Sequence, residues 1–172
     1  TFQVDWGNLD VLVVDFPPGT GDVHLTLTQT VAFSGCILIS TPQDLALVSA
    51  VKGLNMFRKV NVPVLGVVEN MSYFQCGHCN EKTYVFGERG AQKKAEELQI
   101  PFLGEIPLQP PRKIETHATH YVTDAAPIVA SEPQSEQARR YLEIADRIVE
   151  ALEATDKKRS AGENVPKIKM VD

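Results

Sequence analysis

The sequence has few cysteines, no long apolar run and no excess of positive charge, and each shortage excludes a class of protein. Only three cysteines occur in 172 residues, which does not suggest a secreted scaffold held by disulfides. No apolar run approaches the roughly 20 residues that span a bilayer. The formal net charge of -5 argues against binding nucleic acid or anionic membrane through bulk charge. The composition, 43% hydrophobic and 23% charged, is that of a globular domain with one core.

Short apolar segments alternate with helical patterns along most of the chain. Strands are expected at 10–16, 36–40, 62–68 and 102–106. Helices are expected at 26–32, 42–57, 91–98 and 135–152. The apolar run within 10–16 is continuous rather than alternating, which is typical of a parallel sheet buried on both faces. The pattern predicts a doubly wound, mostly parallel α/β sheet in residues 1–154. Residues 155–172, rich in Lys, Ser, Gly and Pro, are predicted to be a disordered tail.

Two of the helices have features that predict how they begin and pack. Thr41 is a plausible N-cap for the helix at 42–57, with Pro42 at its first position. Each helix has an apolar stripe that is expected to face the core. The stripes are Leu45, Val48, Val51, Leu54 and Phe57 in one, and Ala138, Leu142, Ala145, Ile148 and Leu152 in the other.

Polar residues follow the predicted strands, at the edge where such sheets bind ligands. Asp15 ends the first apolar segment, where an aspartate can hold Mg²⁺ beside a nucleotide phosphate; it could equally cap a turn. The loop from Pro17 to Gly19 offers backbone groups to a γ-phosphate. Asn70 follows the third strand, where its amide could pair with a purine edge, although turn capping explains it as well.

Cys76 and Cys79 form a CxxC in a polar loop, and two thiolates at this spacing can hold one metal ion or one face of a cluster. A pair is half of a four-thiolate site, which two chains at a two-fold axis could complete. Redox chemistry and incidental surface thiols remain alternatives, although the loop or hairpin expected after the pair does not suit a thioredoxin-like helix start. Cys36 is expected to be buried and structural. His24, His117 and His120 lack metal spacing and are expected at the surface or in caps.

Several longer stretches together resemble the Mrp/NBP-type iron–sulfur cluster carriers, which are MinD-like P-loop ATPases. They are WGNLDVLVVDFPPGTGD, STPQDLALVSAVKGLNMFRKVNVPVLGVVENMSYFQCGHC, YVFGERGA, LGEIPL and PIVASEPQSEQARRYLEIA. The similarity covers roughly residues 4–152. The run MFRKVNVPVLGVVENMSYFQC most resembles the mitochondrial member, an assembly factor for respiratory complex I.

The resemblance implies a homodimer that binds ATP and passes a [4Fe–4S] cluster, held between its subunits, to recipient apo-proteins. Carried over by position, Cys76 and Cys79 are the metal ligands. Asp15 and Gly19 belong to the loop that holds Mg²⁺ and responds to the phosphate. Asn70 resembles the residue that contacts adenine, and Pro107 lies near the base. The implied location is the mitochondrial matrix, with the cytoplasm as the alternative.

The sequence departs from the family pattern in two places. The stretch between Arg112 and Pro127 is longer than the family's and has Ala126 in place of a glycine, so its role as a nucleotide contact is open. No GK[ST] motif occurs anywhere, so the phosphate grip of a P-loop is missing. The chain is therefore expected to be the carboxyl-terminal part of the domain, to lack the central strand of its sheet, and to be inactive as an ATPase.

Two other functions share parts of this pattern. A MinD-type ATPase with incidental cysteines would have the same fold and no metal. A zinc-stabilised binding module would use the thiol pair without any enzymatic role.

Overall fold

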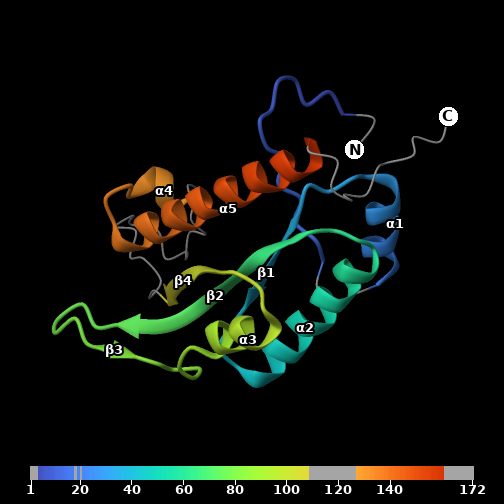
Figure 1. Ribbon diagram of the computed structural model, residues 1–172. Helices are drawn as coiled ribbons and strands as arrows, with labels where there is room; N and C mark the ends of the chain where they lie inside the picture. The colour runs from blue at the N-terminus through green and yellow to red at the C-terminus, as the bar shows by residue number, and fades with distance from the viewer. Residues whose placement is uncertain (1–3, 18, 20, 109–126, 161–172) are drawn as a thin grey trace, which may run out of the picture.

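One long strand organises the sheet, because every other described strand pairs with it (Figure 1). The computed structural model describes residues 4–17, 19, 21–108 and 127–160. The central strand is β2 (Val64–Gln75); β1 (Cys36–Ser40) and β4 (Phe102–Leu108) run parallel to it. The short β3 (Lys82–Thr83) runs antiparallel to the far end of β2.

Helices cover both faces of this sheet (Figure 1). On one face, α2 (Asp44–Lys59) and α3 (Gly90–Leu98) pack against β1 and β2. On the other, α5 (Glu136–Ser160) packs mainly on β4, with the short α4 (Ile128–Ser131) beside it. The remaining helix is α1 (Asp22–Thr30). Parallel strands with helices on both faces confirm the predicted α/β fold class.

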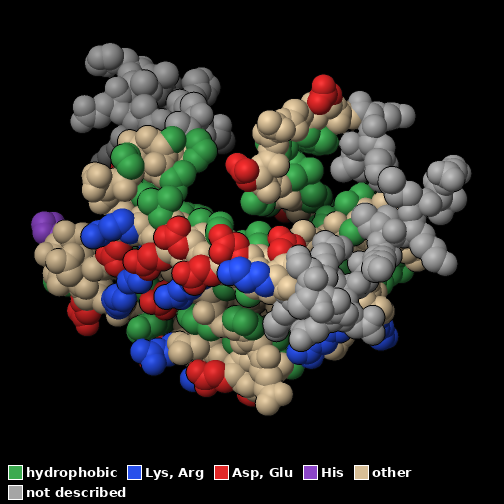
Figure 2. Space-filling view, turned by 45° about the horizontal axis from the view of Figure 1, so that its top comes forward, with side chains coloured by type: hydrophobic (Ala, Val, Ile, Leu, Met, Phe, Trp, Pro, Cys, Tyr) green, Lys and Arg blue, Asp and Glu red, His purple; other side chains and the backbone are tan. Residues whose placement is uncertain are grey.

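Two apolar clusters hold the layers together, one on each side of the sheet. The larger lies between the sheet and α2 and α3, and includes the fully buried Leu54. The smaller joins Ile144 of α5 to three buried residues of β2 and β4. Gly104 permits this close approach, because a Cβ there would lie 2.8 Å from Cγ1 of Ile144. The outer surface of α5 has acidic and basic side chains interspersed (Figure 2).

The third strand is longer than predicted. It was expected to end at Val68, but β2 continues to Gln75, since β3 and β4 both supply partners for its second half. Asn70 is therefore inside a strand rather than after one. Met71 has a left-handed φ of 55°, and the register against β4 shifts between Asn70 and Phe74. A bulge of this kind bends the strand and re-aims the side chains that follow it.

The predicted strand at 10–16 does not form. Its residues are extended but pair with no strand among those the structure describes, and the Val13 side chain is 83% exposed. The other side of β1 is likewise unpaired in the described part of the chain, and Ile39 is 67% exposed. A strand needs a hydrogen-bonded neighbour as well as apolar residues. Nothing in the described residues supplies that neighbour.

The helix boundaries and stripes also differ in part from the prediction. Helix α2 begins at Asp44 with Gln43 as N-cap, so Thr41 and Pro42 precede it. In its predicted stripe, Leu54 and Phe57 are buried, but Leu45 and Val48 are exposed. In α5, Leu142 and Ala145 are exposed, and Ile144 is buried instead. Helix α5 continues to Ser160, so the predicted tail is helical over 155–160; residues 161–172 lie outside the described part.

Candidate functional site

The two neighbouring cysteines lie in a tight turn between β2 and β3. The Cys76 amide donates to the Glu81 carbonyl at 3.0 Å, and the Asn80 amide donates to the Cys76 carbonyl at 2.9 Å. Asn80 has a φ of 58°, a left-handed conformation that asparagine tolerates better than most residues. The prediction of a loop or hairpin after the pair is confirmed. Cys76 is half-buried and Cys79 is exposed, so the turn presents its sulfur atoms to solvent.

The turn directs several hydrogen-bond donors at one sulfur atom. The pKa of Cys76 is lowered chiefly by a hydrogen bond from the backbone N–H of Cys79, then by those from the His78 N–H and the Cys79 thiol. Because a thiolate, not a thiol, ligates metals and attacks electrophiles, this geometry prepares Cys76 for either role.

The third cysteine has the opposite environment. Cys36 was predicted to be buried, but it is half-buried, packed against the larger apolar cluster. Burial raises the pKa of its thiol to about 12, which keeps the thiol protonated and agrees with the expected structural role. His24 was predicted at the surface or in a cap, but its side chain is buried and stacks on Phe16 with ring centroids 4.9 Å apart. His117 and His120 lie outside the described residues.

One copy of the chain supplies an incomplete metal site. Among the described residues, no group of three or more His, Cys, Asp or Glu side chains is arranged to hold an ion. The pair Cys76 and Cys79 therefore offers two sulfur ligands and needs others from elsewhere. A four-thiolate site would be complete with a second such pair.

The four residues predicted to contact nucleotide fall into two places. Asn70 pairs in register with Ile106, so Pro107 lies beside it on the neighbouring strand. Asp15 and Gly19 belong to the exposed amino-terminal segment, and no hydrogen bond or ion pair joins them to Asn70 or Pro107 in the described structure. Asn70 Oδ1 accepts the N–H of Met71 at 2.9 Å, which is a local capping contact. The variant stretch at 112–126 lies outside the described residues.

A buried carboxylate fixes the helix that follows the cysteine hairpin. Glu69, only 1% exposed, accepts the Ala91 N–H at 2.6 Å, at the start of α3. Burial raises the pKa of Glu69, the nearby Glu105 adds to this, and the Ala91 N–H opposes it. The loop between β2 and α3 is thus anchored at both ends. The sequence alone did not reveal Glu69, because a charged residue in a strand is more often at a surface.

Sequence reasoning also missed an aromatic cluster beside the thiols. Tyr73, Tyr84 and Lys82 meet across the hairpin, with Lys82 Nζ 3.9 Å from the centroid of the Tyr73 ring. Alternation along β2 and β3 places these three side chains on one face of the hairpin. That alternation is the signal that could have found them, once β3 was recognised as a strand.

The fold and the site together define a class: an α/β domain of the P-loop NTPase type, with a pair of neighbouring cysteines at the end of its central strand. Residues 1–149 match the family described as ParA: NUBPL iron-transfer P-loop NTPase. The chain belongs to this family. No described helix is long and apolar enough to cross a membrane.

Two curated relatives show how much of the family's length is present. The "Iron-sulfur cluster transfer protein NUBPL" of Dictyostelium discoideum is 46% identical over 96% of this chain and 50% of the relative. The "Iron-sulfur protein required for NADH dehydrogenase, mitochondrial" of Arabidopsis thaliana is 45% identical over 88% of this chain and 47% of the relative. The chain spans about half the length of the curated relatives it matches.

A solved structure supports the fold assignment. A nucleotide-binding protein from Archaeoglobus fulgidus, in complex with ADP and with cobalt, superposes with a TM-score of 0.54 at 45% sequence identity. The match covers 60% of this chain and 43% of that chain.

Proposed function

We propose that this chain supplies the cluster-binding part of an iron–sulfur cluster carrier. Cys76 and Cys79 from each of two copies would hold one [4Fe–4S] cluster as cargo, and the dimer would pass it to apo-proteins. The observation that supports this most is the turn itself, which is closed by hydrogen bonds from the Cys76 N–H to the Glu81 carbonyl and from the Asn80 N–H to the Cys76 carbonyl, and which leaves Cys79 exposed and Cys76 half-buried. Two thiolates in one such turn can bind one face of a cluster.

The need for two copies follows from the ligand count. A [4Fe–4S] cluster takes four thiolates, and the hairpin has two. Cys36 is not a substitute, because it lies at the start of β1 with a protonated thiol. The exposed hairpin lies at one end of the molecule (Figure 1), where a second copy can approach. A two-fold axis through that end would bring four sulfur atoms together.

Nucleotide binding is proposed for the whole protein rather than for this chain alone. Asn70 and Pro107, adjacent on β2 and β4, would contact the base, while Asp15 and Gly19 would act at Mg²⁺ and the phosphates. The ADP bound to the Archaeoglobus fulgidus protein supports a nucleotide site in this fold. Because the chain has no GK[ST] motif, we propose that ATP hydrolysis requires residues beyond it.

Recipients and location follow from the relatives. The Arabidopsis thaliana relative is named as a mitochondrial iron–sulfur protein required for NADH dehydrogenase. We therefore propose apo-subunits of respiratory complex I as recipients and the mitochondrial matrix as the location. Bacterial members of the family are named iron–sulfur cluster carriers too, so the cytoplasm is the alternative.

Anaerobic reconstitution with iron and sulfide tests the proposal. The chain is expected to gain a broad absorbance near about 400 nm and about four irons per dimer. Cys76→Ala and Cys79→Ala should each lose most of this iron, while the matched control Cys36→Ala should retain it. Full iron loading in Cys76→Ala would refute the carrier function. Stoichiometric zinc in place of iron would instead indicate a zinc-stabilised module.

A further inference from the structure

The cysteine turn is closed by an unusually short strand. β3 has two residues, and its pairs with β2 are Phe74 with Thr83 and Gln75 with Lys82. Two pairs of this kind give little stability by themselves, because an isolated hairpin is marginal in water. The turn nevertheless keeps a defined geometry, in which the Cys76 N–H donates to the Glu81 carbonyl and the Asn80 N–H donates to the Cys76 carbonyl. Something besides the ladder therefore has to close the hairpin.

The side chains around Tyr73 provide that closure. The Lys82 ammonium lies over the face of the Tyr73 ring, 3.9 Å from its centroid. Tyr84 meets the same ring edge-on, with centroids 6.2 Å apart and an interplanar angle of 64°. Both partners come from the returning segment, so both fasten it to β2. Contacts of each type favour association beyond simple burial.

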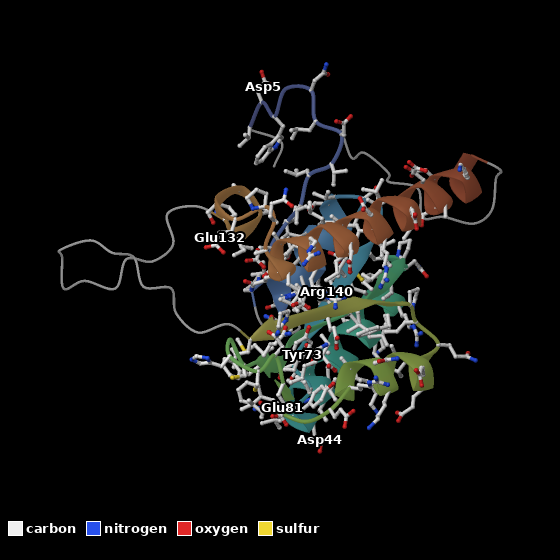
Figure 3. The ribbon with its side chains drawn as sticks, turned by 90° about the vertical axis from the view of Figure 1, so that its left-hand side faces the viewer. Asp5, Asp44, Tyr73, Glu81, Glu132 and Arg140 are labelled. Atoms are coloured by element: carbon white, nitrogen blue, oxygen red, sulfur yellow. The ribbon has the colours of Figure 1, made fainter. Side chains whose placement is uncertain are left out.

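Tyr73 itself is firmly placed. Its side chain is only 1% exposed. In Figure 3, Tyr73 lies between Arg140 and the hairpin turn at Glu81. The Tyr73 hydroxyl is buried and has no hydrogen-bond partner in the described structure, so its ring rather than its hydroxyl makes the contacts that matter here.

We propose that Tyr73 and Lys82 are positioning residues for the thiol pair. Tyr73 lies three positions before Cys76, and Lys82 lies three positions after Cys79, so their contact closes the loop that holds both sulfur atoms. When the contact is lost, the turn opens, and the two sulfur atoms no longer keep a fixed position relative to each other. This inference rests on the proposed function only for its consequence in iron binding.

The test compares matched variants of the metal-free chain. Lys82→Met removes the cation from an exposed position, and Tyr73→Leu removes the ring while the lysine charge stays. Hydrogen exchange is measured by NMR or mass spectrometry at the Cys76 and Asn80 amides, which donate to carbonyls within the turn. Both variants are expected to exchange these two amides faster by about two- to fivefold, while the Val67 amide of β2 keeps its rate. Their iron affinity should fall about two- to fivefold, the factor that corresponds to an exposed cation–π contact.

The controls restore or spare the contact. Lys82→Arg keeps a cation over the ring, and Tyr73→Phe keeps the ring without the unpartnered hydroxyl, so both should behave as the unaltered chain. Lys93→Met, an exposed lysine on α3, makes the same charge change elsewhere and should have no effect.

Two results would overturn the proposal. One is unaltered exchange of the Cys76 and Asn80 amides in Lys82→Met or in a folded Tyr73→Leu. The other is an equal increase in Lys93→Met, which would assign the effect to net charge. Hydrogen exchange requires no metal, so these results are independent of whether Cys76→Ala keeps iron, which decides the proposed function.

Discussion

The cysteine hairpin and the amino-terminal segment 10–16 are both short pieces of chain, but only one is held in place. The hairpin closes through contacts between residues a few positions apart, from Tyr73 to Tyr84. The segment 10–16 is more apolar, yet it lies extended with Val13 83% exposed and without a strand partner in the described structure. The cysteine turn is closed by contacts between nearby residues, whereas a strand at 10–16 would need a hydrogen-bonded neighbour that the described residues do not supply.

Hydrogen exchange should show this contrast most strongly. Amides of β2, such as that of Val67, which donates to the Pro101 carbonyl at 2.9 Å, are expected to be protected by roughly a thousandfold or more over those of 11–15. The reason is that no backbone hydrogen bond holds 11–15 to any described residue. Native-state exchange followed by mass spectrometry or NMR measures both. Equal protection would mean that 10–16 pairs with a strand after all.

A matched pair of substitutions in α2 compares a buried with an exposed apolar residue. Leu54→Ala removes a fully buried side chain and is expected to lower the free energy of unfolding by about 2–5 kcal/mol. Leu45→Ala makes the same change where the side chain is 81% exposed, and should stay within about 0.5 kcal/mol. Urea denaturation measures both. An equally large fall in the free energy of unfolding for Leu45→Ala would show that something in solution covers that surface.

The pH dependence of stability tests the anchor of the hairpin's far end. Because burial raises the pKa of Glu69, the folded chain binds that proton more tightly than the unfolded chain does. The protonated carboxyl therefore adds stability below the ordinary pKa of 4.5, and this contribution is lost as the pH rises through the raised value. The arginine Arg89 and the N–H of Ala91 reduce the effect, and Glu105 increases it.

The free energy of unfolding of Glu69→Gln, relative to that of the unaltered chain, should therefore increase as the pH rises across that window. Denaturation midpoints at a series of pH values measure the difference, and Glu96→Gln, an exposed carboxyl on α3, controls for loss of charge. A difference that stays constant with pH, or one that changes in the opposite direction, would contradict the buried-carboxyl interpretation. This effect is the smallest of the three.

The parts of the structure that follow from local pattern were predictable. The strand at Cys36–Ser40, the helix near Gly90–Leu98 and the hairpin after Cys79 all appear close to where the sequence placed them. The incorrect predictions concern features that depend on other segments of the chain. The segment 10–16 lacks a neighbouring strand, and β2 is longer than predicted because β3 and β4 pair with its second half. Leu45 is exposed because α2 packs on the sheet through its other residues.

The candidate site divides in the same way. The spacing of Cys76 and Cys79 predicted the pair, and the structure adds the donors that no spacing reveals. Tyr73, Lys82 and Glu69 went unnoticed, because their roles depend on a cross-strand diagonal and on the position of α3. Asn70 and Pro107 meet through strand register, while Asp15 stays apart from them.

The central claim is that one cluster needs the thiol pairs of two chains. Size-exclusion chromatography with light scattering, with iron measured across the same peak, tests it directly after reconstitution. We expect iron only in the species with twice the chain mass of 19.0 kDa, at about four irons per two chains, and none in Cys76→Ala. A fully loaded species with the mass of one chain would contradict the claim.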